Sequence, residues 1–164
     1  MKSYISVLLL CLLTGLVRGF QFDLIQMKVY LVTKCGYSAA FGYSICGDEM
    51  YAAGNYRRAL NCYDKAVKLK VGQKAYEYYL VGRGNMYEEV GQYQEAEQDY
   101  IASIKVNPNY WISSFCLGEL RKRLDKQDLA AEDLKRSYRI ALLHDQKGSA
   151  YILSKYPEVR QGKQ

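Results

Sequence analysis

Proline, histidine and paired cysteines are scarce in this sequence, and each scarcity excludes a class of structure or chemistry. Two prolines in 164 residues permit long helices, because proline interrupts them. His144 is the one histidine and no Cys-x-x-Cys pair occurs, so no ligand set has zinc spacing. The glycines form no phosphate-binding loop, since Gly82 and Gly84 fall inside a predicted helix. We therefore predict no metal, no cofactor and no enzymatic activity.

An excess of one charge is also missing. The formal net charge is +6, and acidic residues are interleaved with basic ones along most of the chain. This balance argues for solubility and gives little support to nucleic acid as a partner. The most basic stretch, Glu119 to Asp128, is interrupted by acids, which favours a solvent-exposed helix end. An acidic partner or a membrane surface is the alternative for that stretch.

Acidic residues are absent from residues 1–19, which form a separate segment. Lys2 precedes an apolar run from Ile5 to Val17, which is shorter than the ~20 residues of a comfortable membrane span. Val17 and Gly19 are small enough to suit the positions before a signal-peptidase cut. We expect a cleaved secretory signal, and hence a secreted or extracytoplasmic protein. An uncleaved N-terminal membrane anchor is the alternative, and a mitochondrial presequence is less favoured.

Cysteine is present but does not define a disulfide framework. Cys35 and Cys46 are eleven residues apart, which on one helix separates them by roughly 16 Å, whereas a disulfide needs Cα atoms within about 7 Å. They are expected to pair only if Gly36 interrupts the helix. An even number of cysteines beyond residue 19 is compatible with an oxidising compartment: Cys35, Cys46, Cys62 and Cys116.

What the sequence does contain is an internal repeat. The stretch GNYRRALNCYDKAVKL begins at Gly54, GQYQEAEQDYIASIKV begins 37 residues later at Gly91, and a third copy has its anchor 34 residues further on, at Asp125. Four other positions keep their size across the copies. Relative to the anchor they are small at −7, small at +5, large at +9 and small at +12: Gly47, Gly84, Gly118; Ala59, Ala96, Ala130; Tyr63, Tyr100, Leu134; Ala66, Ser103, Ser137.

This pattern predicts pairs of antiparallel helices. The anchor glycine ends the first helix in a left-handed conformation, which glycine adopts most readily. The small residues let the two helices approach closely, and the large residue fills the space between one pair and the next. One hairpin cannot bury its own apolar face, so about three stacked units are needed.

The pattern resembles the tetratricopeptide repeat. In the best copy, Glu77 to Tyr110, Leu80 stands at the usual tryptophan position and Arg83 replaces the usual leucine, but seven positions match the family signature: Gly84, Tyr87, Gly91, Tyr93, Ala96, Tyr100 and Pro108. The resemblance implies an all-α fold, a short α-solenoid of antiparallel helical hairpins.

The resemblance also divides the chain. Three repeats occupy residues 40–147, and a capping helix with a polar tail follows over residues 148–164. Residues 20–39 mix alternating and helical spacing, and the sequence alone does not assign their structure.

In this family the first helix of each hairpin lines the concave side of the stack. A peptide or helix with an apolar face would suit such a groove. The alternative is that some of its aromatic residues are buried beneath the N-terminal segment. The resemblance implies that a partner contacts Phe41, Ser44, Asp48, Tyr78, Val81, Asn85, Ile112, Phe115, Glu119 and Lys122, with Tyr51, Glu88, Glu89 and Arg123 on the same side.

One binding mode of the family is not expected here. Some tetratricopeptide domains hold a chaperone's C-terminal carboxylate with lysine, asparagine and arginine side chains. The corresponding positions of this chain do not match, and the aspartate among them would repel a carboxylate: Ser44, Asp48, Ile112 and Cys116.

These inferences predict a module that binds another protein or peptide segment and no nucleic acid. We expect an adaptor or co-chaperone in a secretory or extracytoplasmic compartment. The alternative is a structural accessory subunit of a larger membrane-associated complex, because large exposed aromatic surfaces often mark a permanent partner.

Overall fold

The computed structural model describes residues 24–34, 38–69 and 75–160. The expected signal at residues 1–19, the pairing of Cys35 and the end of the tail lie outside these ranges. Within them, no helix combines the length and the apolarity that a membrane span needs. The regular elements described are all helical: α2 (Leu24–Lys34), α3 (Ala39–Ala52), α4 (Tyr56–Lys68), α5 (Tyr76–Glu89), α6 (Tyr93–Val106), α7 (Trp111–Arg123), α8 (Gln127–His144), α9 (Gln146–Lys155) and the 3₁₀ helix η1 (Pro157–Arg160).

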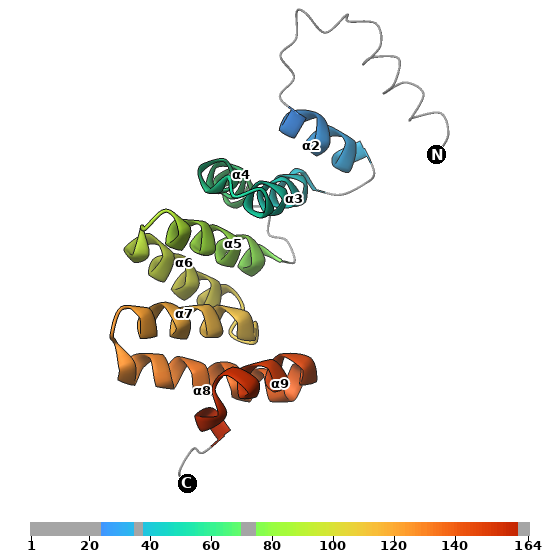
Figure 1. Ribbon diagram of the computed structural model, residues 1–164. Helices are drawn as coiled ribbons and strands as arrows, with labels where there is room; N and C mark the ends of the chain where they lie inside the picture. The colour runs from blue at the N-terminus through green and yellow to red at the C-terminus, as the bar shows by residue number, and fades with distance from the viewer. Residues whose placement is uncertain (1–23, 35–37, 70–74, 161–164) are drawn as a thin grey trace, which may run out of the picture.

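The helices form one elongated stack (Figure 1). α3 pairs with α4, α5 with α6, and α7 with α8, and the second helix of each pair packs on the first helix of the next. α2 packs on α3 at one end of the stack, and α9 and η1 pack on α8 at the other. The predicted all-α solenoid of helical hairpins with a C-terminal capping helix is confirmed.

The anchor residue of each repeat ends the first helix of its hairpin, as predicted. Gly54 and Gly91 have φ angles of 73° and 81°, in the left-handed region. Asp125 adopts the same conformation at φ 60°, although it carries a side chain. In all three turns the amide after the anchor donates to a carbonyl five residues earlier, for example Asn55 N to Met50 O at 2.8 Å. The weaker third copy therefore keeps the turn of the first two.

The close helix packing depends on the small residues that the repeat predicted. A Cβ atom at Gly47 would lie 2.6 Å from the ring of Tyr63, and one at Gly84 would lie 2.6 Å from the ring of Tyr100. The third copy has the same contact with a leucine in place of the tyrosine. The alanines five residues after each anchor are buried where the paired helices cross: Ala59, Ala96 and Ala130.

Helix α2 assigns most of the segment that the sequence left open. Val29 is buried against α3, where a Cβ at Gly42 would lie 3.1 Å from the Val29 Cα atom. Lys28 forms an ion pair with Glu49 of α3. One apolar and one ionic contact therefore fix α2 on the first hairpin.

The capping helix completes the opposite end. α9 and η1 cover an apolar cluster whose members come from α7, α8, α9 and η1. Asp145 caps α9, because its side chain accepts a hydrogen bond from the Gly148 amide at 3.0 Å. The buried members of this cluster are Phe115, Leu134, Ala141, Ile152, Tyr156 and Val159.

Candidate partner-binding surface

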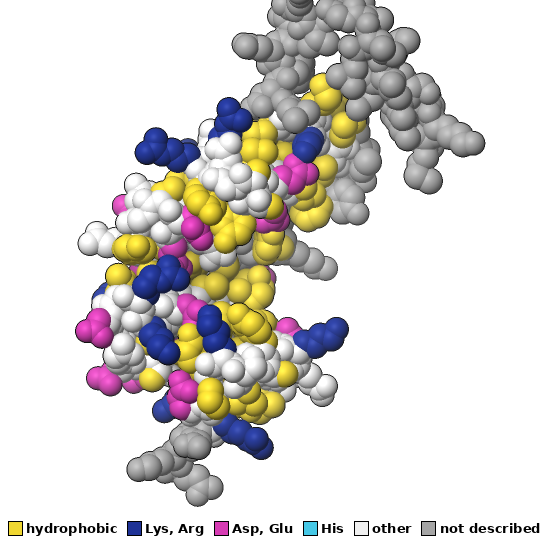
Figure 2. Space-filling view, viewed as in Figure 1, with side chains coloured by type: hydrophobic (Ala, Val, Ile, Leu, Met, Phe, Trp, Pro, Cys, Tyr) yellow, Lys and Arg dark blue, Asp and Glu magenta, His cyan; other side chains and the backbone are white. Residues whose placement is uncertain are grey.

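The predicted partner residues all come from α3, α5 and α7, whose outer sides form a surface that we call the first-helix face. α3 contacts α5 and α5 contacts α7, so the three helices form a continuous wall. Figure 2 shows hydrophobic side chains along the stack with acidic and basic side chains between them. The polar groups of the first-helix face are organised around one position, six residues before each anchor.

In the first hairpin this position is Asp48. Tyr63 of α4 and Tyr78 of α5 both donate hydroxyl hydrogens to its carboxylate, Tyr78 at 2.7 Å from Oδ2. Burial raises the pKa of both phenols, that of Tyr78 to about 12. Both phenols therefore stay protonated at neutral pH, and Asp48 remains an exposed carboxylate fixed by two donors.

In the second hairpin the position is Asn85. The Tyr100 hydroxyl lies 2.7 Å from Asn85 Oδ1 and 2.5 Å from Glu88 Oε1. Arg123 of α7 forms an ion pair with Glu88 at 2.7 Å. Burial nevertheless raises the pKa of Glu88, because the Tyr100 hydrogen bond and the largely exposed Arg123 offset only part of the cost of burying the carboxylate.

In the third hairpin the position is Glu119, and the capping segment supplies its partners. Lys155 and Tyr156 both donate to the Glu119 carboxylate. The Lys122 ammonium lies 4.4 Å from the centre of the Tyr156 ring, which is a cation–π contact. The three equivalent residues Asp48, Asn85 and Glu119 thus each accept a tyrosine hydroxyl. Their shared offset from the anchor is the sequence signal that would have revealed this pattern.

Three predicted partner residues are buried, which corrects the expectation that they face a partner. Ser44 is 1% exposed and donates to the Phe41 carbonyl one turn earlier. Val81 is 4% exposed, within the core between α5, α6 and α7. Phe115 is 8% exposed because Tyr151 and Tyr156 of the capping segment pack against its ring.

The other predicted residues reach the surface. Phe41 and Tyr51 are 36% and 44% exposed. Tyr78, Asn85, Ile112 and Glu119 are partly exposed, and Asp48 and Lys122 are exposed. The predicted alternative, burial of aromatic residues beneath the N-terminal segment, does not describe Phe115, which the C-terminal segment covers.

Two arginines between the hairpins were not predicted to have a role. Arg83 of α5 binds both carboxylate oxygens of Asp99 at 2.7 Å and Asp64 Oδ1 at 3.1 Å. Arg121 of α7 binds Glu97 at 2.8 Å and Asp133 at 2.7 Å in the same way. Each arginine lies on the first helix of a hairpin. It bonds to the second helix of the same hairpin and to the second helix of the preceding hairpin.

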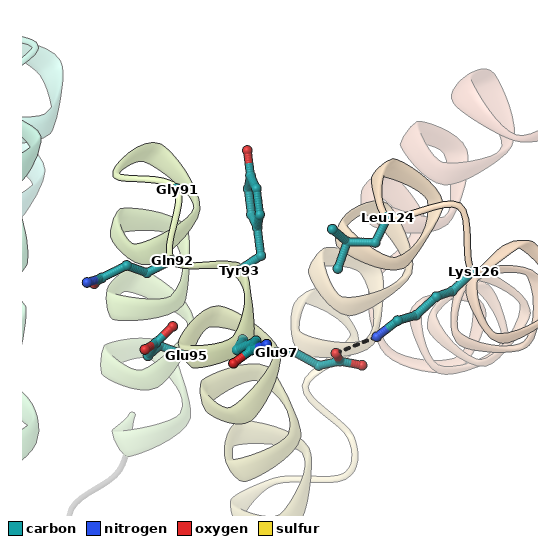
Figure 3. Close-up of a pocket in the computed structure, with 8 residues that line it drawn as sticks. Gly91, Gln92, Tyr93, Glu95, Glu97, Leu124 and Lys126 are labelled. Carbon is teal, nitrogen blue, oxygen red and sulfur yellow. Dashed lines mark hydrogen bonds and ion pairs between the residues drawn. The ribbon is translucent and has the colours of Figure 1, made fainter.

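A surface depression of about 560 Å³ lies at the hairpin turns, between the start of α6 and the connection from α7 to α8. Tyr93 and Leu124 stand on opposite sides of it, and Glu97 and Lys126 form an ion pair at 2.9 Å (Figure 3). It contains no predicted site residue. His144 ends α8 and is exposed.

The cysteines and acidic groups show no further chemistry in the described part of the chain. Cys46 and Cys62 are buried in one cluster with Val29. Burial raises the pKa of the Cys116 thiol to about 12, which keeps it a thiol at neutral pH. Among the residues described, no three His, Cys, Asp or Glu side chains gather as a metal-binding group.

Comparison with known proteins identifies the repeat. The tetratricopeptide repeat family model matches residues 77–110. The human mitochondrial import receptor subunit TOM70 is 26% identical over 90 residues, which are 54% of this chain and 15% of that receptor, and its mouse counterpart gives the same values. The chain therefore corresponds to a small part of those receptors.

Solved structures share the fold. PcrH in complex with the chaperone binding region of PopB has a TM-score of 0.64 and 19% identity, covering 70% of this chain and 92% of PcrH. The first tetratricopeptide domain of Spaghetti (RPAP3), bound to the HSP90 peptide SRMEEVD, has a TM-score of 0.60 and 19% identity, covering 74% of this chain and 90% of that domain. Residues 77–110 therefore match a tetratricopeptide repeat, and the hairpin turns and small–large contacts of the neighbouring copies give the chain the fold of several such repeats.

Proposed function

We propose that this chain is a protein-interaction module that binds a polypeptide segment on its first-helix face. The observation that carries the proposal is the exposure of Phe41 and Tyr51 on a wall whose helices are already packed. Aromatic side chains of this kind anchor partners by burying large areas at low entropic cost. The second-helix side is instead linked internally by the Arg83 and Arg121 ion pairs.

The structural relatives support binding of a polypeptide. One tetratricopeptide domain of RPAP3 holds an HSP90 peptide, and PcrH holds the chaperone binding region of PopB. The present chain departs from a carboxylate clamp, because Asp48 is acidic and Ser44 is buried. The mode of binding proposed here is therefore burial of apolar side chains against the exposed aromatic rings.

Within this function we propose an adaptor or co-chaperone in the secretory pathway, on the strength of the apolar, acid-free residues 1–19. An accessory subunit of a membrane-associated complex is the alternative, and the import-receptor relatives favour a mitochondrial location for it. Intact mass of the native protein separates the two: a chain beginning near Phe20 supports secretion, and a mass that includes residues 1–19 rejects cleavage.

The test of the function is crosslinking and capture from the native compartment with paired variants. Phe41→Ala with Tyr51→Ala removes two exposed anchors of the first-helix face. Tyr93→Ala with Leu129→Ala removes two similarly exposed side chains from second helices. Loss of two anchors commonly costs about 2 kcal/mol or more, on the order of thirtyfold in affinity.

We expect the first pair to lose its partners and the second pair to retain them, with equal helix content by circular dichroism. Equal capture by both pairs would contradict the proposal. Loss of capture by the second pair alone would move the site to the second-helix side.

A further inference from the structure

The charges of the first-helix face are unevenly compensated, and this bears on the chemistry of the partner. Building on the function proposed above, we infer that the bound segment is basic, with a lysine or arginine that contacts Asp48 and Glu89 while its apolar side chains contact Tyr51 and Tyr78. This deepens the proposed function by naming the partner's charge and the place where it is recognised.

Three carboxylates of α3, α5 and α7 already have a cation. Glu49 pairs with Lys28, Glu88 with Arg123, and Glu119 with Lys155. Asp48 and Glu89 form no salt bridge with any lysine or arginine that the structure describes. Their contacts are instead tyrosine hydroxyls, from Tyr63 and Tyr78 at Asp48 and from Tyr51 at Glu89, the last at 3.4 Å.

Neutral donors orient a carboxylate without cancelling its charge. The two phenols bonded to Asp48 stay protonated at pH 7, because burial raises the pKa of both, so they donate hydrogen bonds to its carboxylate and bring no positive charge. Tyr51 lies three residues after Asp48, on the next turn of α3, and its hydroxyl reaches Glu89 on α5. The two carboxylates therefore belong to one patch across the α3–α5 junction, with an exposed aromatic ring between them.

The same junction suits the rest of a lysine or arginine side chain. Tyr51 is exposed and packs at 5.6 Å from the ring of Tyr56, and Tyr78 is partly exposed. Aromatic faces attract a cation and also cover the methylene stem of a long basic side chain. Ring and carboxylate together favour a cationic side chain over a purely apolar one.

The far end of the face has the opposite character. Lys122 is exposed at the end of α7 and makes no salt bridge with a described residue, and Arg123 beside it is largely exposed. A tail as acidic as SRMEEVD, which RPAP3 binds, would bring like charge to Asp48 and Glu89. This face therefore selects against acidic tails at the α3–α5 junction.

The experiment pans a phage-displayed library of random 12-residue peptides against the immobilised full chain. The best enriched peptide is then synthesised with a fluorescent label, and its affinity is measured by anisotropy. The variants are Asp48→Asn and Glu89→Gln, which keep the size and an acceptor oxygen for the tyrosines. Asp128→Asn is the matched control, since Asp128 is an exposed carboxylate on the second-helix side.

We expect the enriched peptides to contain more lysine and arginine, and less aspartate and glutamate, than the input library. Each of Asp48→Asn and Glu89→Gln should weaken the labelled peptide about fivefold, the upper range for one exposed ion pair, and Asp128→Asn should leave it unchanged. Added salt should weaken binding to the wild type more than to the double variant.

Three results would overturn the inference. Enriched peptides without a basic bias, whose binding is still lost in the Phe41→Ala, Tyr51→Ala variant, would reject the basic partner and retain the first-helix face as the binding surface. Basic peptides that bind Asp48→Asn and Glu89→Gln as well as wild type would place the charge recognition elsewhere. No enrichment over the input would reject peptide binding, and the inference with it.

Discussion

A single glycine decides how closely the second hairpin approaches the first. Gly82 faces the Tyr63 ring, and a Cβ there would lie 2.1 Å from the ring atom Cε1. The ring is buried, and its hydroxyl is bonded to Asp48, so it has no open space into which to move. The repeat pattern predicted the glycine at Gly47 on the other side of this ring, but it did not predict Gly82.

We therefore expect Gly82→Ala to destabilise the protein. Overpacking commonly costs about 1–3 kcal/mol, and a contact this short should outweigh the ~1 kcal/mol that alanine gains over glycine in a helix. Thermal unfolding followed by circular dichroism measures the change. Gln98→Ala, at an exposed site on α6, should stay within about 0.5 kcal/mol. An unchanged melting temperature for Gly82→Ala would contradict the prediction, because the packing cost would then be no larger than the helix-propensity gain of alanine.

The anchor residues allow a second prediction, in which two substitutions change the stability in opposite directions. Asp125 holds the left-handed conformation that glycine holds at Gly91. Asp125→Gly should relieve backbone strain and stabilise by about 0.5 kcal/mol, after the extra entropy of the unfolded glycine. Gly91→Ala should cost about 1 kcal/mol, since no atom within 4 Å hinders its Cβ and only the backbone conformation opposes it. Chemical denaturation should give Asp125→Gly a higher free energy of unfolding than wild type and Gly91→Ala a lower one. A change in the same direction for both variants would contradict the strain argument.

Glu88 predicts a dependence on pH. Burial raises its folded pKa above the unfolded value, so between the two values the folded state holds more protons than the unfolded state. The contribution of Glu88 to stability is therefore present at acidic pH and is lost as pH rises through this window. Glu88→Gln keeps an acceptor for Tyr100 and removes the titration. Between pH 4 and pH 8, the free energy of unfolding should fall less steeply with rising pH for the variant than for the wild type. Parallel curves for the two proteins would exclude Glu88 as the cause.

At the scale of helices, ion pairs set how one hairpin sits on the next. Arg83 joins α5 to α4 and α6, and Arg121 joins α7 to α6 and α8. In the sequence Arg83 was only a departure from the family's usual leucine. Its partners, Asp64 and Asp99, lie on two other helices, so no local spacing could reveal the bond. Asp99 is buried, which makes the pair costly to break from one side.

Restoring the family's leucine should therefore harm this protein. Arg83→Leu leaves Asp99 buried without its cation, and breaking a buried pair in this way costs about 3–5 kcal/mol. Arg83→Leu with Asp99→Leu removes both charges and should recover most of that loss. A double-mutant cycle by urea denaturation measures the coupling. If the double variant is less stable than Arg83→Leu alone, the bond to Asp99 is not the source of the cost.

For the whole molecule, the sequence predicted the repeats and the C-terminal capping helix, but not which residues of the first-helix face the capping segment covers. The turns and the small–large contacts follow from local spacing, since each involves residues of one hairpin and its neighbour. The exposure of the first-helix face does not follow from local spacing. A helical pattern shows which side of a helix faces away from its partner helix, but not whether a third element covers that side. Phe115 is the clear case: residues 36 to 41 positions later in the chain, Tyr151 and Tyr156, bury it.

Removal of residues 146–164 should therefore loosen one end of the stack only. It uncovers Phe115 and Leu134, whereas α3 and α4 make no contact with α9 or η1, the helices that the structure describes in that segment. Because each unit of a solenoid contacts its neighbours alone, the loss should stay local. Hydrogen exchange should show faster exchange in α7 and α8 and unchanged rates in α3 and α4. Ile152→Ala should give a weaker change of the same kind, and uniform acceleration along the chain would indicate one cooperative unit.

The position of Trp111 makes this closing contact directly observable. It is the one tryptophan of the chain, its indole N–H donates to Asp145 at 3.1 Å, and a Cβ at Gly148 would lie 2.6 Å from its ring. Its fluorescence, excited at the red edge where tyrosine does not absorb, therefore reports on the docking of α9. Far-ultraviolet circular dichroism follows all the helices, so stopped-flow unfolding recorded with both signals would time the opening of the end against the loss of the body of the stack in one unlabelled molecule.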